Sequence, residues 1–162
     1  MNGGPLPIVA ASVLAILLLI AAVSDLRARI IPNWLNLVIA ITAPLAWVTM
    51  GLSLWPDLAW QIATAAAVFA LFVAMFAFNA IGGGDVKLIG ALALWIQPGL
   101  ISSLLLIMAL VGGGIAAAML IHRKITKAGD VAEVPYGVAI AVAGLWAIHE
   151  QFVNHFPPLS TH

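Results

Sequence analysis

Long runs of apolar, uncharged residues alternate with short polar segments along the whole chain. Residues 5–23, 34–54 and 58–80 form three such runs, each close to the ~20 residues with which a helix crosses the ~30 Å hydrocarbon layer of a membrane. Residues 88–121 are too many for one helix, and Gln97-Pro98-Gly99 divides them, because proline lacks an N–H donor and glycine loosens the backbone. A last run extends from residue 134 to about residue 152. The pattern predicts an all-α membrane protein with six transmembrane helices, in a single domain that covers residues 1–162.

The basic residues predict how these helices are oriented. In an up-and-down arrangement, the first, third and fifth connections lie at the same face of the membrane. These connections and the helix start beside one of them hold all six Lys and Arg residues of the chain, namely Arg27, Arg29, Lys87, Arg123, Lys124 and Lys127. Because basic residues favour the cytoplasmic side, we expect this face in the cytoplasm and both termini outside.

The composition excludes several classes of function. Hydrophobic residues make up 64% of the chain and charged residues only 7%, whereas soluble domains carry about a quarter charged residues. Six basic and six acidic residues balance, so nucleic-acid binding is not expected. The chain has no cysteine, which excludes disulfides, thiol nucleophiles and Cys-ligated zinc. The pair His149-Glu150 and His155 do not have the spacing of H-E-x-x-H, and we expect neither a metal nor another cofactor.

Four of the six acidic residues have a structural explanation. Asp57 falls at a helix start, where a carboxylate stabilises the free N–H groups, and Glu150 falls near the outer end of the last helix. Asp130 and Glu133 belong to a polar segment that is typical of a solvated loop. The chemistry is therefore expected from the other two carboxylates.

Asp25 and Asp85 are predicted to reach the same edge of the membrane. Asp25 directly follows the first apolar run, while Asp85 opens the fourth helix after Gly82-Gly83-Gly84, and these helices run in opposite directions. Residues 85–96 give only ~18 Å of helix, which places the start of this helix below the membrane surface. An ionisable group at that depth is costly unless it faces a polar cavity. Non-helical backbone there survives only when it is buried in protein or lines a cavity.

Two carboxylates in one site favour peptide hydrolysis. Because they cannot both ionise easily, one holds a proton while the other activates water. Each aspartate alone also has a structural interpretation: Asp25 would pair with Arg27 or Arg29, and Asp85 would cap a helix.

Three motifs resemble the type IV prepilin peptidase family, the membrane aspartyl peptidases with a GxGD motif. The first is Asp25-Leu26-Arg27-Ala28-Arg29-Ile30-Ile31-Pro32-Asn33. The second is Gly82-Gly83-Gly84-Asp85-Val86-Lys87-Leu88, which matches GxGDxKL. The third is Val134-Pro135-Tyr136-Gly137-Val138-Ala139-Ile140, at the start of the last helix. The resemblance covers nearly the whole chain.

The resemblance implies the role of each motif. Asp25 and Asp85 would be the catalytic pair of a site open to the cytoplasm, Gly82 and Gly84 would shape the loop, and Pro135-Tyr136-Gly137 would line or support the cleft. The reaction would remove the leader of a prepilin just before its hydrophobic helix, typically after a glycine. For Lys87 two roles stay open: it would hold a substrate carboxylate or bias the pKa of the pair, or it would extend to the membrane interface.

The expected substrate follows from one departure. Longer members of the family carry an N-terminal extension with paired cysteines and also methylate the pilin. This chain starts almost at the first helix and has no cysteine, so it resembles the short subgroup of Flp/Tad pili in the bacterial inner membrane. We expect Flp-type prepilins as substrates and no N-methylation, while it stays open whether pseudopilins are also cleaved. Two other functions stay open: a small proton- or ion-coupled transporter, and a non-catalytic subunit of pilus assembly.

Overall fold

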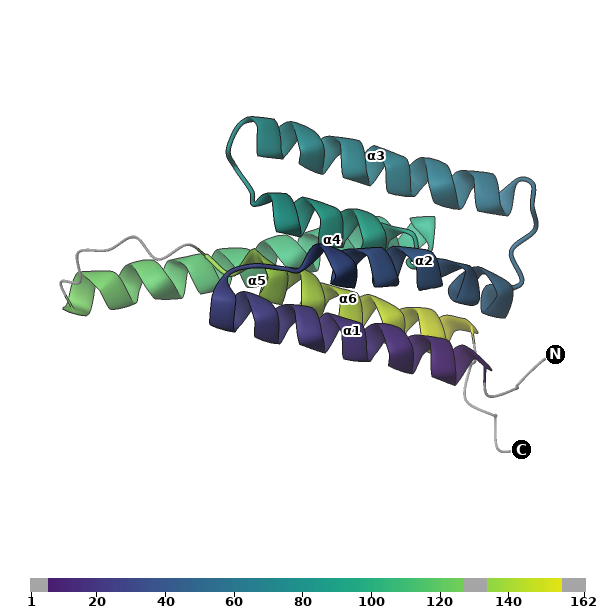
Figure 1. The fold of residues 1–162 in the computed structure, drawn as a ribbon, viewed down its shortest axis with the longest axis horizontal. Helices are drawn as coiled ribbons and strands as arrows, with labels where there is room; N and C mark the ends of the chain where they lie inside the picture. Colours follow the sequence, from purple (N-terminus) through teal and green to yellow (C-terminus); the bar gives the residue numbers. More distant parts are fainter. Residues whose placement is uncertain (1–5, 127–133, 156–162) are drawn as a thin grey trace.

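Six helices form the described part of the chain. A computed structural model describes residues 6–126 and 134–155, without the side chains of residues 152–155. The helices are α1 (Leu6–Ala28), α2 (Asn33–Met50), α3 (Asp57–Ala77), α4 (Gly83–Ala93), α5 (Pro98–Thr126) and α6 (Tyr136–His155) (Figure 1). The predicted count of six helices and the predicted break before Pro98 are confirmed. Lys127, Asp130, Glu133 and the side chain of His155 lie outside the described residues.

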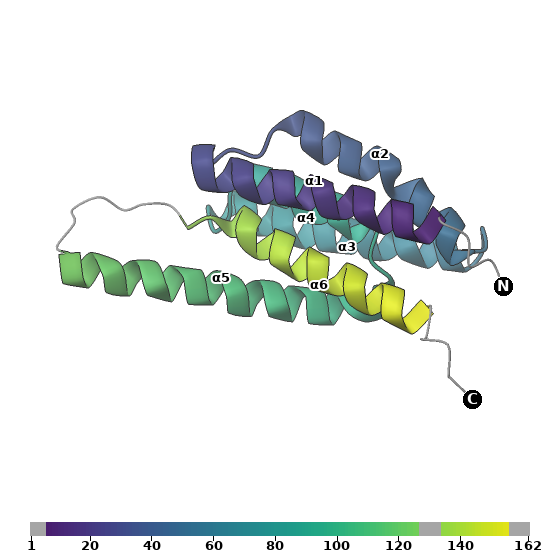
Figure 2. The same ribbon diagram turned by 90° about the horizontal axis from the view of Figure 1, so that it is seen from below.

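The helices alternate in direction. Figures 1 and 2 show that α1, α3 and α5 end, and α2, α4 and α6 begin, at one end of the bundle, drawn at the left. This is called the aspartate end below, because Asp25 and Asp85 lie there. The described Lys and Arg residues lie in or beside helix ends at the same end, as the sequence predicts.

α4 lies at the centre of the bundle. It packs against α2, α3 and α6, while α5 packs mainly against α6. Leu88, Ile89 and Leu92 of α4 are fully buried. The short helix is therefore held on several sides, which fixes the position of the residues at its start.

Four of the helices are long and apolar enough to cross a membrane, namely α1, α2, α3 and α5. The protein is therefore an all-helical, multi-pass membrane protein. α4 has 11 residues, or ~16 Å of helix, and is too short to cross the layer alone. That all six helices cross the bilayer stays a prediction.

The last residue of α4 and the chain after it have carbonyl groups without helical partners, and side chains from α2 and α3 donate hydrogen bonds to them. The buried Nε2 of Gln61 donates to the carbonyl oxygens of Ala93 (3.0 Å), Leu94 (3.0 Å) and Ile96 (2.8 Å). The Nε1 of Trp47 also donates to the carbonyl of Leu94, at 2.8 Å. Because an unpaired carbonyl in a membrane costs several kcal/mol, these bonds allow α4 to end inside the bundle.

Two predicted helix boundaries near the aspartates are wrong. Asp25 does not follow α1 but lies within it, because α1 continues past the apolar run to Ala28. The helix stops where Arg29 adopts a left-handed conformation (φ 55°) and its N–H donates to the carbonyl of Asp25 at 2.9 Å. Asp85 does not open α4 but lies in its first turn, because the helix begins two residues earlier, at Gly83.

Candidate active site

A cavity of about 590 Å³ opens at the aspartate end, and both Asp25 and Asp85 line it. The α1–α2 connection, the α3–α4 connection and the start of α6 form its other walls. Segments that are far apart in the sequence therefore bring two carboxyl groups to one hollow that is open to the outside.

Asp25 comes from the last turns of α1 and is buried, with 6% of its surface exposed. The backbone N–H groups of Gly137 and Val138, at the start of α6, face its carboxyl group, and the positive charge of Arg29 also acts on it. Among the described residues, none makes a hydrogen bond to its Oδ2. A buried carboxylate oxygen without a partner is costly, and such groups are concentrated where they have a chemical role.

Asp85 lies in the first turn of α4 and is half-buried. The backbone N–H of Gly82, which precedes the helix in an extended conformation, faces its carboxyl group. A Cβ atom on Gly82 would lie 3.0 Å from Oδ2 of Asp85, so the glycine allows the loop to fold closely over the carboxyl group.

The two carboxyl groups influence each other, since the charge of Asp25 acts on Asp85. Like charges at short range make it unfavourable for both groups to ionise, so such a pair tends to share one proton. A pair with one acid and one base is able to activate water and to protonate a leaving group.

Gly137 of α6 lies directly against Asp25. A Cβ atom at this position would lie 2.8 Å from Oδ2 of Asp25 and 2.8 Å from Cδ1 of Ile31. No larger residue fits unless Asp25 moves. The neighbouring Tyr136 lines the cavity, and its ring packs on Gly112 of α5, whereas Pro135 is buried outside the cavity lining.

Ile31 is a residue that sequence reasoning did not single out. It is 5% exposed and lies between Gly137 and Gly84. A Cβ atom on Gly84 would lie 3.4 Å from Cβ of Ile31. Ile31 therefore packs the segment between α1 and α2 against Gly84 and against the start of α6. The feature of the sequence that could have identified Ile31 is its place between Asp25 and Pro32 in the first motif.

Lys87 lies outside the cavity lining, although it is two residues from Asp85. Its Nζ donates to Oδ1 of Asn33 at 2.8 Å, and both residues line a second hollow, on the α2 and α3 side of α4. The bond connects α4 with the start of α2.

Asp57 stabilises the start of α3 and the turn before it. It is the first residue of α3, and its Oδ2 accepts hydrogen bonds from the backbone N–H (3.1 Å) and the hydroxyl (2.8 Å) of Ser53. These bonds close the turn before α3. The carboxylate also lies at the helix N-terminus, where negative charge is favourable.

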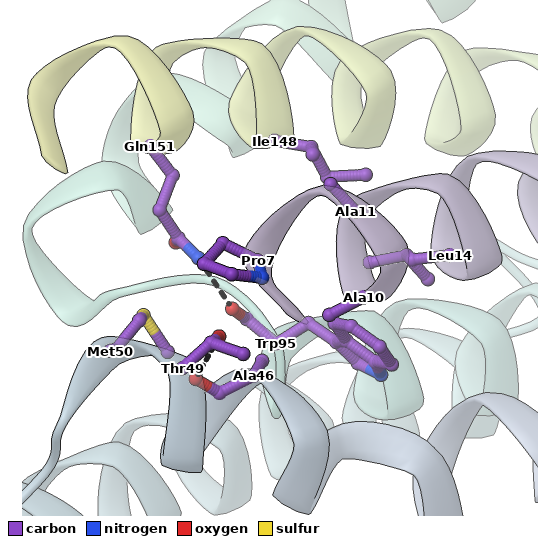
Figure 3. Close-up of a pocket in the computed structure, with 10 residues that line it drawn as sticks. All are labelled: Pro7, Ala10, Ala11, Leu14, Ala46, Thr49, Met50, Trp95, Ile148 and Gln151. Atoms are coloured by element: carbon purple, nitrogen blue, oxygen red, sulfur yellow. Dashed lines mark hydrogen bonds between the residues drawn. The ribbon is translucent and has the colours of Figure 1, made fainter. Parts of the chain in front are cut away.

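A smaller cavity of about 40 Å³ lies at the other end of the bundle (Figure 3). Residues of α1, α2 and α6 line it, together with Trp95, and the amide Nε2 of Gln151 donates to the carbonyl of Trp95 at 3.2 Å. None of its lining residues is acidic or basic. It is therefore a packing feature, and the larger cavity is the candidate active site.

Comparison with known proteins identifies a family. The sequence pattern of the type IV leader peptidase family matches residues 12–117, well over half of the chain, and the matched part contains both Asp25 and Asp85. No curated protein and no solved structure matches the chain.

Proposed function

Because the chain belongs to the type IV leader peptidase family, we propose that it is an aspartic endopeptidase that removes the leader of Flp/Tad-type prepilins with Asp25 and Asp85 as its catalytic pair. A peptidase of this kind acts on prepilin-type substrates. The observation that carries the aspartic mechanism is the cavity of about 590 Å³ that both carboxyl groups line.

In the proposed reaction, the ionised carboxylate takes a proton from a water molecule as the water oxygen attacks the carbonyl carbon of the scissile peptide bond. The protonated carboxyl group donates its proton to the carbonyl oxygen. When the tetrahedral intermediate collapses, the C–N bond breaks, and the nitrogen leaves as an amine after it receives the proton taken from water. One hydroxyl group of the intermediate returns its proton to the second carboxylate, which leaves a carboxylic acid and restores the pair. The new amine is the N-terminus of the mature pilin.

The glycines allow the substrate to reach this pair. An extended peptide needs room beside both carboxyl groups, and Gly82-Gly83-Gly84 offers backbone without side chains along one wall of the cavity. Gly137 allows α6 to lie against Asp25, so the backbone N–H groups at the start of α6 face the carboxyl group. Holding the carboxyl groups and the peptide bond in fixed positions relative to one another accelerates their reaction.

We place the site at the cytoplasmic face of the bacterial inner membrane. Arg27, Arg29, Lys87, Arg123 and Lys124 belong to the end of the bundle that holds the cavity, and an excess of basic residues marks the cytoplasmic side. In this orientation α1 begins and α6 ends at the outer side. We treat the helices as one peptidase domain, because α4 packs against α2, α3 and α6.

Coexpression with a Flp-type prepilin tests the proposal. The host is a bacterium without its own prepilin peptidase, and electrophoresis with N-terminal sequencing follows the shortened pilin. We expect a product that begins at the start of the hydrophobic helix. Full-length prepilin only, with both proteins inserted in the membrane, would contradict the proposed function.

A further inference from the structure

A second hollow runs from the aspartate end into the membrane part of the bundle. It is an open groove of about 580 Å³, with walls from α2 and α3 and a floor from α4. The lining residues cover eight positions on each side, namely 33–40 on α2, 62–69 on α3, and 87–94 on α4 and the residue after it. Seven steps of 1.5 Å correspond to ~10 Å, or about two helical turns.

Small residues line much of this groove. Ala40, Ala66 and Ala91 belong to the three helices that form it. Gly90, also on the floor, lets the ring of Phe69 approach, since a Cβ atom there would lie 2.5 Å from Cδ2 of Phe69. Grooves with small residues let the backbone of another helix come close, which is how helices pack in membranes.

The groove adjoins the aspartate cavity. Asn33 lines both hollows, and Nδ2 of Asn36, one turn deeper in the groove, is 3.5 Å from the carbonyl oxygen of Gly84 in the cavity wall. A chain that passes the carboxyl groups therefore reaches the groove at Asn33, where the two hollows meet.

Asn36 also indicates what the groove binds. Its side chain is 5% exposed, and Oδ1 has no hydrogen-bond partner among the described residues. The first four N–H groups of a helix have no partner within that helix. A helix that begins just after the scissile bond brings such donors to this depth, whereas a lipid acyl chain brings none.

We propose that the groove between α2 and α3 seats the first two turns of the prepilin's hydrophobic helix, with the amide of Asn36 turning toward the groove so that Oδ1 accepts a hydrogen bond from a free N–H of the first turn. The proposal rests on the proposed function, because it assigns the helix that follows the cleaved bond. It makes the groove a substrate-positioning site that fixes which peptide bond reaches the two aspartates.

Two matched variants test the groove. Ala66 and Ala67 are consecutive exposed residues of α3, but only Ala66 lines the groove. Each is replaced by phenylalanine, and KM is measured for a full-length Flp-type prepilin and for a peptide that contains the leader and cleavage site but no hydrophobic helix. For Ala66→Phe we expect the ratio of KM for prepilin to KM for peptide to rise roughly three- to thirtyfold, and for Ala67→Phe to stay unchanged.

Cross-linking gives a second readout that does not depend on turnover. Because the chain has no cysteine, Ala66→Cys or Ala67→Cys introduces a single thiol. In an Asp85→Asn background, a prepilin with one cysteine in the first two turns of its helix should form a disulfide with Ala66→Cys and not with Ala67→Cys.

The outcomes separate the two proposals. Cleavage of prepilin by the wild type, with an unchanged KM ratio in Ala66→Phe and no selective cross-link, would overturn the groove assignment and leave the peptidase assignment intact. Such a result would favour a lipid chain in the groove. If the wild type cleaves neither substrate, the proposed function fails and the groove assignment fails with it.

Discussion

Gly137→Ala is expected to impair catalysis by displacing Asp25. The added Cβ atom would lie 2.8 Å from Oδ2 and 2.9 Å from Cγ of Asp25, whereas an ordinary contact is at least 3.4 Å. The carboxyl group or the start of α6 must therefore move by about 0.6 Å. A shift of about 1 Å in a reacting group costs about 10²-fold in rate, and overpacking costs ~1–3 kcal/mol of stability.

Gly144→Ala is the matched control for this substitution. Gly144 is also a buried glycine of α6, and its Cβ atom would lie 2.8 Å from Cδ1 of Leu18 and 2.9 Å from Cδ2 of Leu92, away from the aspartates. Both variants should lose a similar ~1–3 kcal/mol in the free energy of unfolding. Only Gly137→Ala should also lose about 10²-fold in kcat.

The two variants are compared in prepilin processing and in thermal unfolding in detergent. If Gly137→Ala keeps the kcat of the wild type, Asp25 either tolerates the displacement or does not take part in the reaction. If Gly144→Ala loses as much kcat as Gly137→Ala, the effect comes from general overpacking of α6, and the argument from the contact with Asp25 is refuted.

Two further substitutions follow from the same contacts. Gly84→Val should lower processing by more than about tenfold, because the methyl groups of valine would crowd Ile31. Gly84→Ala should stay within about threefold of the wild type, because the Cβ atom of alanine would make an ordinary contact at 3.4 Å. Equal activity of both variants in the gel assay would mean that the loop does not need this space. Lys87→Met should lower kcat by less than about tenfold, because Lys87 lies outside the cavity lining and its Nζ bonds to Asn33. A loss as large as that from replacing an aspartate would show that the ammonium group acts on the reaction.

Much of the fold was predictable because hydrophobic length reports the thickness of the membrane. The apolar runs give the six helices, and the break at Pro98 separates α4 from α5. Helix ends were less predictable, because backbone conformation sets them and not polarity. α1 continues through Ser24, Asp25 and Arg27 until Arg29 turns left-handed, and α2 ends before the apolar run does, because Gly51 adopts φ 66°.

The candidate site was predictable only in part. The pattern of charges and helix directions placed Asp25 and Asp85 at the same end, and the structure brings both to one cavity. The contact of Gly137 with Asp25 depends on how α6 packs against α1, which no local pattern reports; this glycine came from the resemblance alone. The groove could not be predicted, because it forms from faces of α2, α3 and α4 whose spacing is set by packing.

Whether Asp25 and Asp85 act together is tested most directly by prepilin processing with Asp25→Asn, Asp85→Asn and the double variant, each checked for membrane insertion. We expect each single variant to lose at least about 10³-fold in rate, and the double variant to lose no more than either single one, because a pair that transfers a proton fails when either member can neither accept nor release it. Full processing by either inserted single variant would show that the two carboxyl groups are not a catalytic pair.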